Sequence, residues 1–150
     1  MEETRSFLGT GWSFPPQFSK PAGGVVMISD ETDIKNSMEV LLSTRVGERI
    51  LQPKYGCNLD EILFEPLTVS LQTYIKDLVF TAIYYFEPRI KPENVTLIPS
   101  AEEGLVIVSV DYMIRATNTR HNLVYPFYLN EGADVNESIS KNLTVQSQTA

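Results

Sequence analysis

The hydrophobic pattern of this chain changes its period once, and that change limits the folds it can adopt. Between Thr68 and Phe86, apolar side chains recur three and four positions apart, the spacing of a helix with a wide apolar face. From Leu105 to Ala116, apolar side chains recur every second residue, as in a strand with one buried face. Helices therefore precede strands along the chain, and one face of the long strand is expected to lie on the helices while the other is partly wet.

Weaker signals place the remaining elements. Ser29 or Asp30 can begin a first helix, which Gly47 is expected to end. A short helical turn is predicted over 59–64, and shorter strands are predicted over 95–98 and 123–129.

The second helix is almost free of charge along its length. Lys76 and Asp77 are its only charged residues before Glu87, so most of its circumference is expected to be covered.

The strand predicted over 105–116 is longer than its predicted neighbours. Strands usually have about five or six residues, so a longer one would leave unpaired backbone that a partner could use. Pro126 cannot donate to a strand ladder, which predicts an edge strand or a bulge at 123–129. Residues 142–146 could add a further strand on binding.

Composition divides the chain into three parts. The first part is rich in Gly, Pro and aromatic residues, and Trp12 and Phe14 are too apolar for a freely solvated tail. We expect them to anchor either on the domain or on a neighbouring protein. The predicted parts are an N-terminal segment, 1–28, a domain of helices and strands, 29–129, and a polar C-terminal tail, 130–150.

The charge and cysteine content exclude some classes of function. A net charge of −7 and a pI near 4.7 disfavour nucleic acids and anionic membrane surfaces as partners. Cys57 is the single cysteine, so no intramolecular disulfide can form and a reducing compartment is expected. The first residues do not resemble a secretion signal, and no apolar run approaches the ~18 residues of a membrane span. We therefore expect a cytoplasmic protein without direct membrane binding.

Few residues suggest catalysis. Glu48, Glu65 and Glu87 are the candidates for a carboxylate pair of the kind that hydrolyses glycosides, although nothing in the sequence brings them together. His121 lies in a predicted polar hairpin loop, and neither it nor Cys57 belongs to a metal-binding spacing. Gly9-Thr10-Gly11 follows no predicted strand and opens no helix, so it is not a nucleotide-binding loop. We expect no cofactor, no metal and no small-molecule substrate.

Glu87-Pro88-Arg89, at the end of the second helix, is the most informative local sequence. A carboxylate at a helix C-terminus destabilises the helix by about 0.3–1 kcal/mol unless a nearby positive group compensates its charge. Arg89 or a partner protein could supply that group. The alternative is an ordinary surface ion pair worth less than about 1 kcal/mol.

Several motifs together resemble one known family. GWSFPPQF, TRVGERILQPKYGCNLDEILFEP and FEPRI are similar to sequences of the baseplate wedge family of contractile injection systems. That family includes the "lysozyme-like" baseplate wedge protein of contractile-tailed phages and TssE of type VI secretion systems.

The resemblance implies an α+β fold, with two main helices packed on one face of a small antiparallel sheet of three or four strands. It also implies a structural protein rather than an enzyme. The alternatives are a peptidoglycan-degrading enzyme of the same assembly and a regulatory adaptor on the same fold. The partners of the structural protein would be larger baseplate wedge subunits and the sheath protein, whose assembly it would initiate by β-strand addition at the 106–129 hairpin. The Glu87-Pro88-Arg89 triplet carries over as a wedge-contact site, and substitution of Arg89 would then spare the isolated fold. Trp12, Phe14 and Arg49 fall in matching motifs and are further partner-binding candidates.

Overall fold

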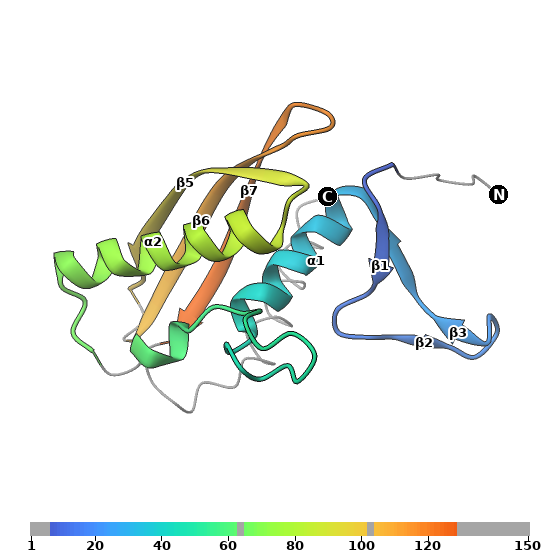
Figure 1. Cartoon of the computed structure of the whole chain (residues 1–150), viewed down its shortest axis with the longest axis horizontal. Coiled ribbons are helices and arrows are strands. Elements are labelled where there is room, and N and C mark those ends of the chain that lie inside the picture. Colours follow the sequence, from blue (N-terminus) through green and yellow to red (C-terminus); the bar gives the residue numbers. More distant parts are fainter. Residues whose placement is uncertain (1–6, 63–64, 102–103, 129–150) are drawn as a thin grey trace.

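The computed structural model describes residues 7–62, 65–101 and 104–128. Its main sheet has the order β5-β6-β7, formed by β5 (Ile90–Pro99), β6 (Leu105–Ile114) and β7 (Thr119–Tyr128), all antiparallel. Two helices, α1 (Asp30–Ser43) and α2 (Val69–Phe86), lie on one face of this sheet (Figure 1). The predicted α+β architecture is therefore confirmed.

The core lies between the helices and the inner face of the sheet. Alternate residues of β6, from Val106 to Ile114, are buried, while those between them are only half-buried. Ile34 and Met38 of α1 and Ile75, Val79 and Ile83 of α2 are almost completely buried against this face. The period of two along β6 thus decides which face of the sheet carries the helices.

The three strands of the sheet are equally long, which corrects the prediction of an overhanging central strand. β5 has ten residues rather than four, because it begins at Ile90 and passes through Pro92, with a bulge between Pro92 and Asn94. A proline is tolerated there because β5 is an edge strand. β6 is therefore paired on both sides, and unpaired main chain lies at the outer margins instead. Pro126 is in β7, the other edge strand, as predicted.

Helix α1 ends four residues before the predicted stop at Gly47. Thr44 has extended backbone, and its hydroxyl donates to the Val40 carbonyl at 2.6 Å. The Thr44 carbonyl accepts a hydrogen bond from the Cys57 N–H at 2.9 Å, so the chain leaves the helix to begin a closed loop. Within that loop Gly47 adopts a positive φ of 89°.

Helix α2 begins and ends as predicted, but much of it is uncovered. The Thr68 hydroxyl accepts the Leu71 N–H at 3.2 Å and caps the helix, and Pro88 follows its last turn. The expectation of a mostly covered circumference is wrong. Several aromatic side chains on the outer side are exposed: Tyr74 (50%), Phe80 (38%), Tyr84 (55%) and Tyr85 (72%).

The N-terminal segment forms a β-hairpin that extends away from α1 (Figure 1). Two short antiparallel ladders build it: β1 (Thr10–Trp12) with β4 (Met27–Ser29), and β2 (Phe18–Ser19) with β3 (Gly24–Val25). The N–H of Ser13 donates to the Val26 carbonyl between the ladders, so 10–29 forms one arm. We call residues 10–29 the hairpin arm.

The remaining predictions concern short or terminal segments. A 3-10 helix, η1 (Leu59–Ile62), accounts for the first part of the turn predicted over 59–64, whose last two residues lie outside the described residues. The polar tail and its possible strand at 142–146 also lie outside them. No helix in the described part of the chain is long and apolar enough to cross a membrane.

Candidate partner-binding site

A three-residue ion cluster forms where α2 ends and β5 begins. Arg89 binds the Glu87 carboxylate with two hydrogen bonds, Nε to Oε1 at 2.6 Å and the second guanidinium nitrogen to Oε2 at 2.7 Å. The other nitrogen donates to Asp33 Oδ2 on α1 at 2.6 Å. We call Asp33, Glu87 and Arg89 the Arg89 cluster. It joins both helices to the start of the sheet.

The same guanidinium also holds the chain that enters the hairpin arm. The nitrogen that binds Asp33 donates to the Leu8 carbonyl at 3.2 Å, and Leu8 itself is buried. At the next residue, the Gly9 carbonyl accepts the N–H of Asp30, the first residue of α1, at 3.3 Å. The base of the hairpin arm is thus attached to the Arg89 cluster and to the first turn of α1.

Two glycines let the arm approach the cluster this closely. Gly9 has a φ of +104°, and a Cβ there would lie 3.3 Å from the Arg89 guanidinium. A Cβ at Gly11 would collide with the Asp33 carboxylate. Gly9-Thr10-Gly11, which does not fit a nucleotide site, therefore serves packing of β1 against charged side chains.

The electrostatics of the cluster are those of a permanent ion pair. Burial alone would raise the pKa of Glu87, but hydrogen bonds from Arg89 and Ser37 and the charge of Arg89 outweigh it and hold that pKa below its ordinary value. Hydrogen bonds to Glu87 and Asp33, with the charges of both, likewise raise the pKa of Arg89 against the effect of burial. Arg89 therefore supplies the positive charge that Glu87 requires at the helix C-terminus.

The cluster leaves only part of the triplet within reach of a partner. Glu87 is 3% exposed, whereas Pro88 is exposed and the Arg89 side chain is 29% exposed. Partner contact by the triplet stays a prediction, but it now rests on Pro88 and one side of Arg89. Because Glu87 is buried, loss of Arg89 is no longer expected to spare the isolated fold.

The other predicted site residues lie at two further places. Trp12 (63% exposed) and Phe14 (43% exposed) are on the hairpin arm, so the domain does not cover them, and a neighbouring protein remains their predicted anchor. Arg49 lies over the Tyr55 ring at 4.3 Å, and Tyr55 meets Phe86 edge-on at 5.3 Å. Arg49 is thereby linked through two aromatic rings to the end of α2.

Sequence reasoning missed Asp33 and Gly11. No local sequence pattern marks Asp33 for this role, because its partner Arg89 lies 56 positions away in the chain. For Gly11, the available signal was its place beside the aromatic Trp12 in a segment rich in Gly and Pro.

The three carboxylates considered for catalysis have separate roles. Glu48 accepts the Arg45 N–H at 3.0 Å within its own loop, and Glu65 is exposed between η1 and α2. Glu87, bound by Arg89, has a lowered pKa, whereas a general acid requires a raised one. The burial of Cys57 raises the pKa of its thiol to about 12, with a further contribution from Asp60, so it is not a ready nucleophile.

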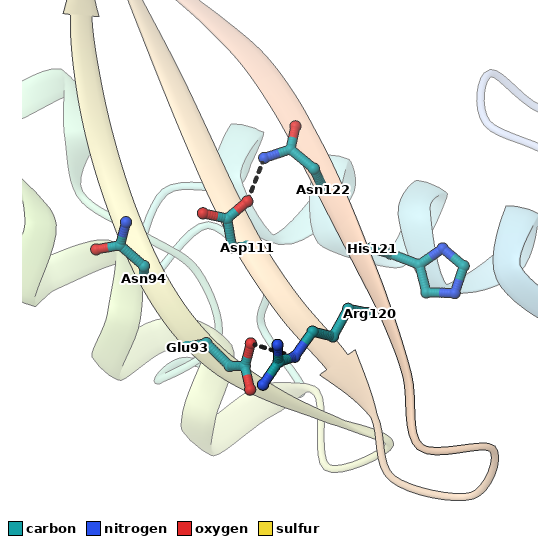
Figure 2. A pocket seen from close by; sticks show the side chains of 6 residues that line it. All are labelled: Glu93, Asn94, Asp111, Arg120, His121 and Asn122. Carbon is teal, nitrogen blue, oxygen red and sulfur yellow. Dashed lines mark hydrogen bonds and ion pairs between the residues drawn. The ribbon is translucent and has the colours of Figure 1, made fainter.

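A shallow polar depression lies on the sheet face opposite the helices. Figure 2 shows Asp111 receiving a hydrogen bond from Asn122 at 2.7 Å, and Arg120 paired with Glu93 at 3.3 Å. His121 points away from these residues. It belongs to β7 and not to the predicted hairpin loop, since the turn spans 115–118, and it contacts Glu31 of α1 at 3.3 Å. Among the described residues, no group of three or more His, Cys, Asp or Glu could hold a metal ion.

These features define the class of protein. The chain is a small α+β module whose charged cluster stabilises its own fold. Several aromatic side chains on α2 and on the hairpin arm are exposed, as in proteins that assemble with others.

Residues 28–119 match the family described as baseplate wedge protein gp25, and the chain belongs to that family. The baseplate wedge protein gp25 of Enterobacteria phage T4 is 32% identical over 81 residues, which are 54% of this chain and 61% of that protein. The match therefore spans less than two thirds of that relative.

Two solved structures extend the comparison. A Geobacter sulfurreducens protein, provisionally named a tail lysozyme, is 40% identical with a TM-score of 0.65, over 72% of this chain and 98% of its own. A chain of the 6-fold symmetrised baseplate of the anti-feeding prophage is 25% identical with a TM-score of 0.60, over 88% of this chain and 93% of its own. The resemblance to the baseplate wedge family is thus confirmed.

Proposed function

We propose that this chain is a non-enzymatic structural component of a contractile injection machine. It takes its place in a baseplate of 6-fold symmetry, binds larger wedge subunits and initiates assembly of the contractile sheath. The machine is assembled in the cytoplasm, as the sequence suggests.

The observation that carries the wedge-binding proposal is the exposed aromatic side of α2. Tyr84 and Tyr85 lie in its last turn, with their rings edge-on and their centroids 5.6 Å apart. The exposed Pro88 comes three residues after Tyr85. Tyrosine is enriched at protein interfaces, because its ring adds contact area at a small cost in conformational entropy. This surface is continuous with the Glu87-Pro88-Arg89 triplet, so one wedge subunit could contact both.

The outer edge of β7 supports the sheath-initiation proposal. β7 pairs with β6 over ten residue pairs, and none of the described strands pairs with its other side. A strand from a sheath subunit could use the free main-chain groups there, since main-chain hydrogen bonds provide the affinity in strand addition. Pro126 limits this edge, so the contact is expected to be made mainly by residues before it.

Hydrogen exchange of the chain, alone and within baseplates carrying sheath, tests the sheath contact. Peptides from 119–125 should gain protection when sheath is attached, because their free N–H groups enter a new ladder. Peptides from 115–118, in the neighbouring turn, serve as the control and should not change. Unchanged exchange along β7 in sheathed particles would exclude strand addition at this edge.

The rival function is cell-wall hydrolysis, which the provisional name of the Geobacter relative suggests for that protein. Purified chain should not clear a suspension of cell walls, because Glu87 is held by Arg89 and Glu48 binds its own loop. Clearing that is abolished by Glu48→Gln or Glu65→Gln would establish the enzyme instead.

A further inference from the structure

Four apolar side chains of the hairpin arm lie on one face. Trp12 stands opposite Met27 in the β1–β4 ladder, and Phe18 stands opposite Val25 in the β2–β3 ladder. Opposed residues share a face, and so do residues two apart in extended chain. Val25 ends β3 and Met27 begins β4, and Val26 between them continues the pairing through hydrogen bonds with Gln17 and Ser13, so all four lie on the same side. We call Trp12, Phe18, Val25 and Met27 the arm face.

The arm face points away from the domain. Gly11 and Ile28, which occupy the opposite face, pair with each other, and Gly11 abuts Asp33 of α1. Three of the four arm-face side chains have no such cover: Trp12 is 63%, Met27 54% and Phe18 75% exposed, whereas Val25 is half-buried. A two-stranded hairpin is marginal in water unless something packs on its apolar face.

The arm is nevertheless held in a fixed direction at its base. Arg89 binds the Leu8 carbonyl, Asp33 fills the space beside Gly11, and Asp30 binds the Gly9 carbonyl. An exposed face on an element attached by its base is preorganised, which lowers the entropy cost of binding. The family match begins at residue 28, so residues 10–27 of the arm lie outside it.

Charge indicates what can cover the arm face. Lys20, in the turn at the tip, is the only charged residue from Thr10 to Ser29, although the chain carries −7 overall. A strongly basic partner surface would find no counter-charge on the arm, and an anionic lipid surface would be repelled by the rest of the chain. An apolar, nearly uncharged protein patch with a carboxylate opposite Lys20 is complementary.

A second copy of this chain fits less well. Two chains of −7 repel each other, and face-to-face packing of two arms requires a two-fold axis. Such an axis does not relate neighbouring copies within a purely cyclic 6-fold ring, the symmetry proposed above for this baseplate.

We propose that the arm face docks onto an apolar, charge-poor patch of a different baseplate subunit, as an attachment separate from α2 and β7. This inference rests on the proposed function. Trp and Phe side chains bury about 150–250 Å² each, and Val25 and Met27 are smaller and partly covered, so the arm face supplies less than the ~800 Å² per partner of a standard interface. It therefore strengthens attachment and fixes orientation, and does not replace the contact at α2.

Photo-crosslinking in purified, assembled baseplates tests this docking. p-Benzoylphenylalanine in place of Trp12 or Phe18 should crosslink to an apolar segment of one other baseplate subunit. The same label in place of Phe7 is the matched control, because Phe7 is as exposed as Phe18 (76% against 75%) but lies before the arm. Label at position 7 should not reach that segment.

Incorporation of substituted chains supplies the second measurement. Trp12→Ala with Phe18→Ala should lower incorporation in competition with wild type by about tenfold or more, whereas Phe7→Ala should not. Circular dichroism should show that the doubly substituted chain remains folded, since both side chains are exposed.

Crosslinks to a second copy of the chain or to a charged segment would overturn the inference. So would equal incorporation of wild type and the double substitution. Wild-type chain that fails to enter baseplates would instead contradict the proposed function itself, so the two failures are distinguishable.

Discussion

Arg89→Met is expected to destabilise the isolated chain substantially. Methionine keeps most of the apolar stem but removes the guanidinium, which leaves the carboxylates of Glu87 and Asp33 close together without a cation. Their side chains are only 4% and 12% exposed. Removing one partner of a buried ion pair costs about 3–5 kcal/mol. The Arg89 side chain is 29% exposed, so water reaches one side of the cluster, and we expect a loss of about 2–4 kcal/mol.

Urea unfolding followed by far-ultraviolet circular dichroism measures this loss. Fluorescence is less suitable, because Trp12 is the single tryptophan and reports on the hairpin arm. For a chain of this length, the expected loss corresponds to a fall in Tm of roughly 5–15 °C. Equal m-values for wild type and Arg89→Met would show that the difference between their urea midpoints reflects a difference in stability.

Arg120→Met is the matched control. Arg120 pairs with Glu93 at 3.3 Å, but its side chain is 78% exposed, so its loss should cost less than about 1 kcal/mol. Adding Glu87→Gln to Arg89→Met should restore part of the stability, because it removes one of the two buried carboxylates that lack a cation. If Arg89→Met costs no more than Arg120→Met, the cluster does not hold the fold together and the reasoning fails.

Three further predictions concern the same region and the core. The pKa of Glu87 is lowered in the folded chain, so its stabilising contribution is complete above about pH 4.5 and is lost as the pH falls through the folded value. Urea midpoints at pH 7 and pH 3 should therefore differ more for wild type than for Glu87→Gln, and equal differences would contradict this. Gly11→Ala should cost about 1–3 kcal/mol because its methyl group meets Asp33, whereas Gly24→Ala, with its nearest neighbour at 3.9 Å, should change unfolding by less than about 0.5 kcal/mol. Tyr112→Phe should leave stability unchanged or raise it, since the buried Tyr112 hydroxyl has no hydrogen-bond partner among the described residues; a clear loss in thermal unfolding would show that a partner exists.

The parts of the fold that sequence reasoning predicted are those with a long, uniform period. Helix α2 has a strong apolar face and a hydroxyl cap at Thr68, and β6 alternates without interruption, so local physics and tertiary structure agree there. The family resemblance rested on motifs elsewhere in the chain, at 11–18, 44–66 and 86–90.

The errors arose where tertiary context overrides a local signal. Lys91-Pro92 indicates a turn, but an edge strand can place the proline where no ladder donor is needed, so β5 begins earlier than predicted. Residues 119–122 are polar and were read as a loop, yet an edge strand facing solvent can be polar on one side.

The site was only partly predictable for a related reason. The conflict at Glu87 could be recognised locally, because a helix C-terminus disfavours a carboxylate. The contribution of Asp33 could not, since it depends on how α1 packs beside α2. The exposure of Trp12 and Tyr85 also follows from tertiary arrangement, and apolar sequence alone suggested that α2 was covered.

Reconstitution of sheath on baseplates that lack this chain tests the central claim most directly. Purified chain would be added to such baseplates, followed by sheath subunits, and sheathed particles would be counted by electron microscopy. The proposed structural role predicts that wild type and the Glu48→Gln/Glu65→Gln variant restore sheath equally. Restoration by wild type but not by that variant, or sheath that forms as well without the chain, would contradict it.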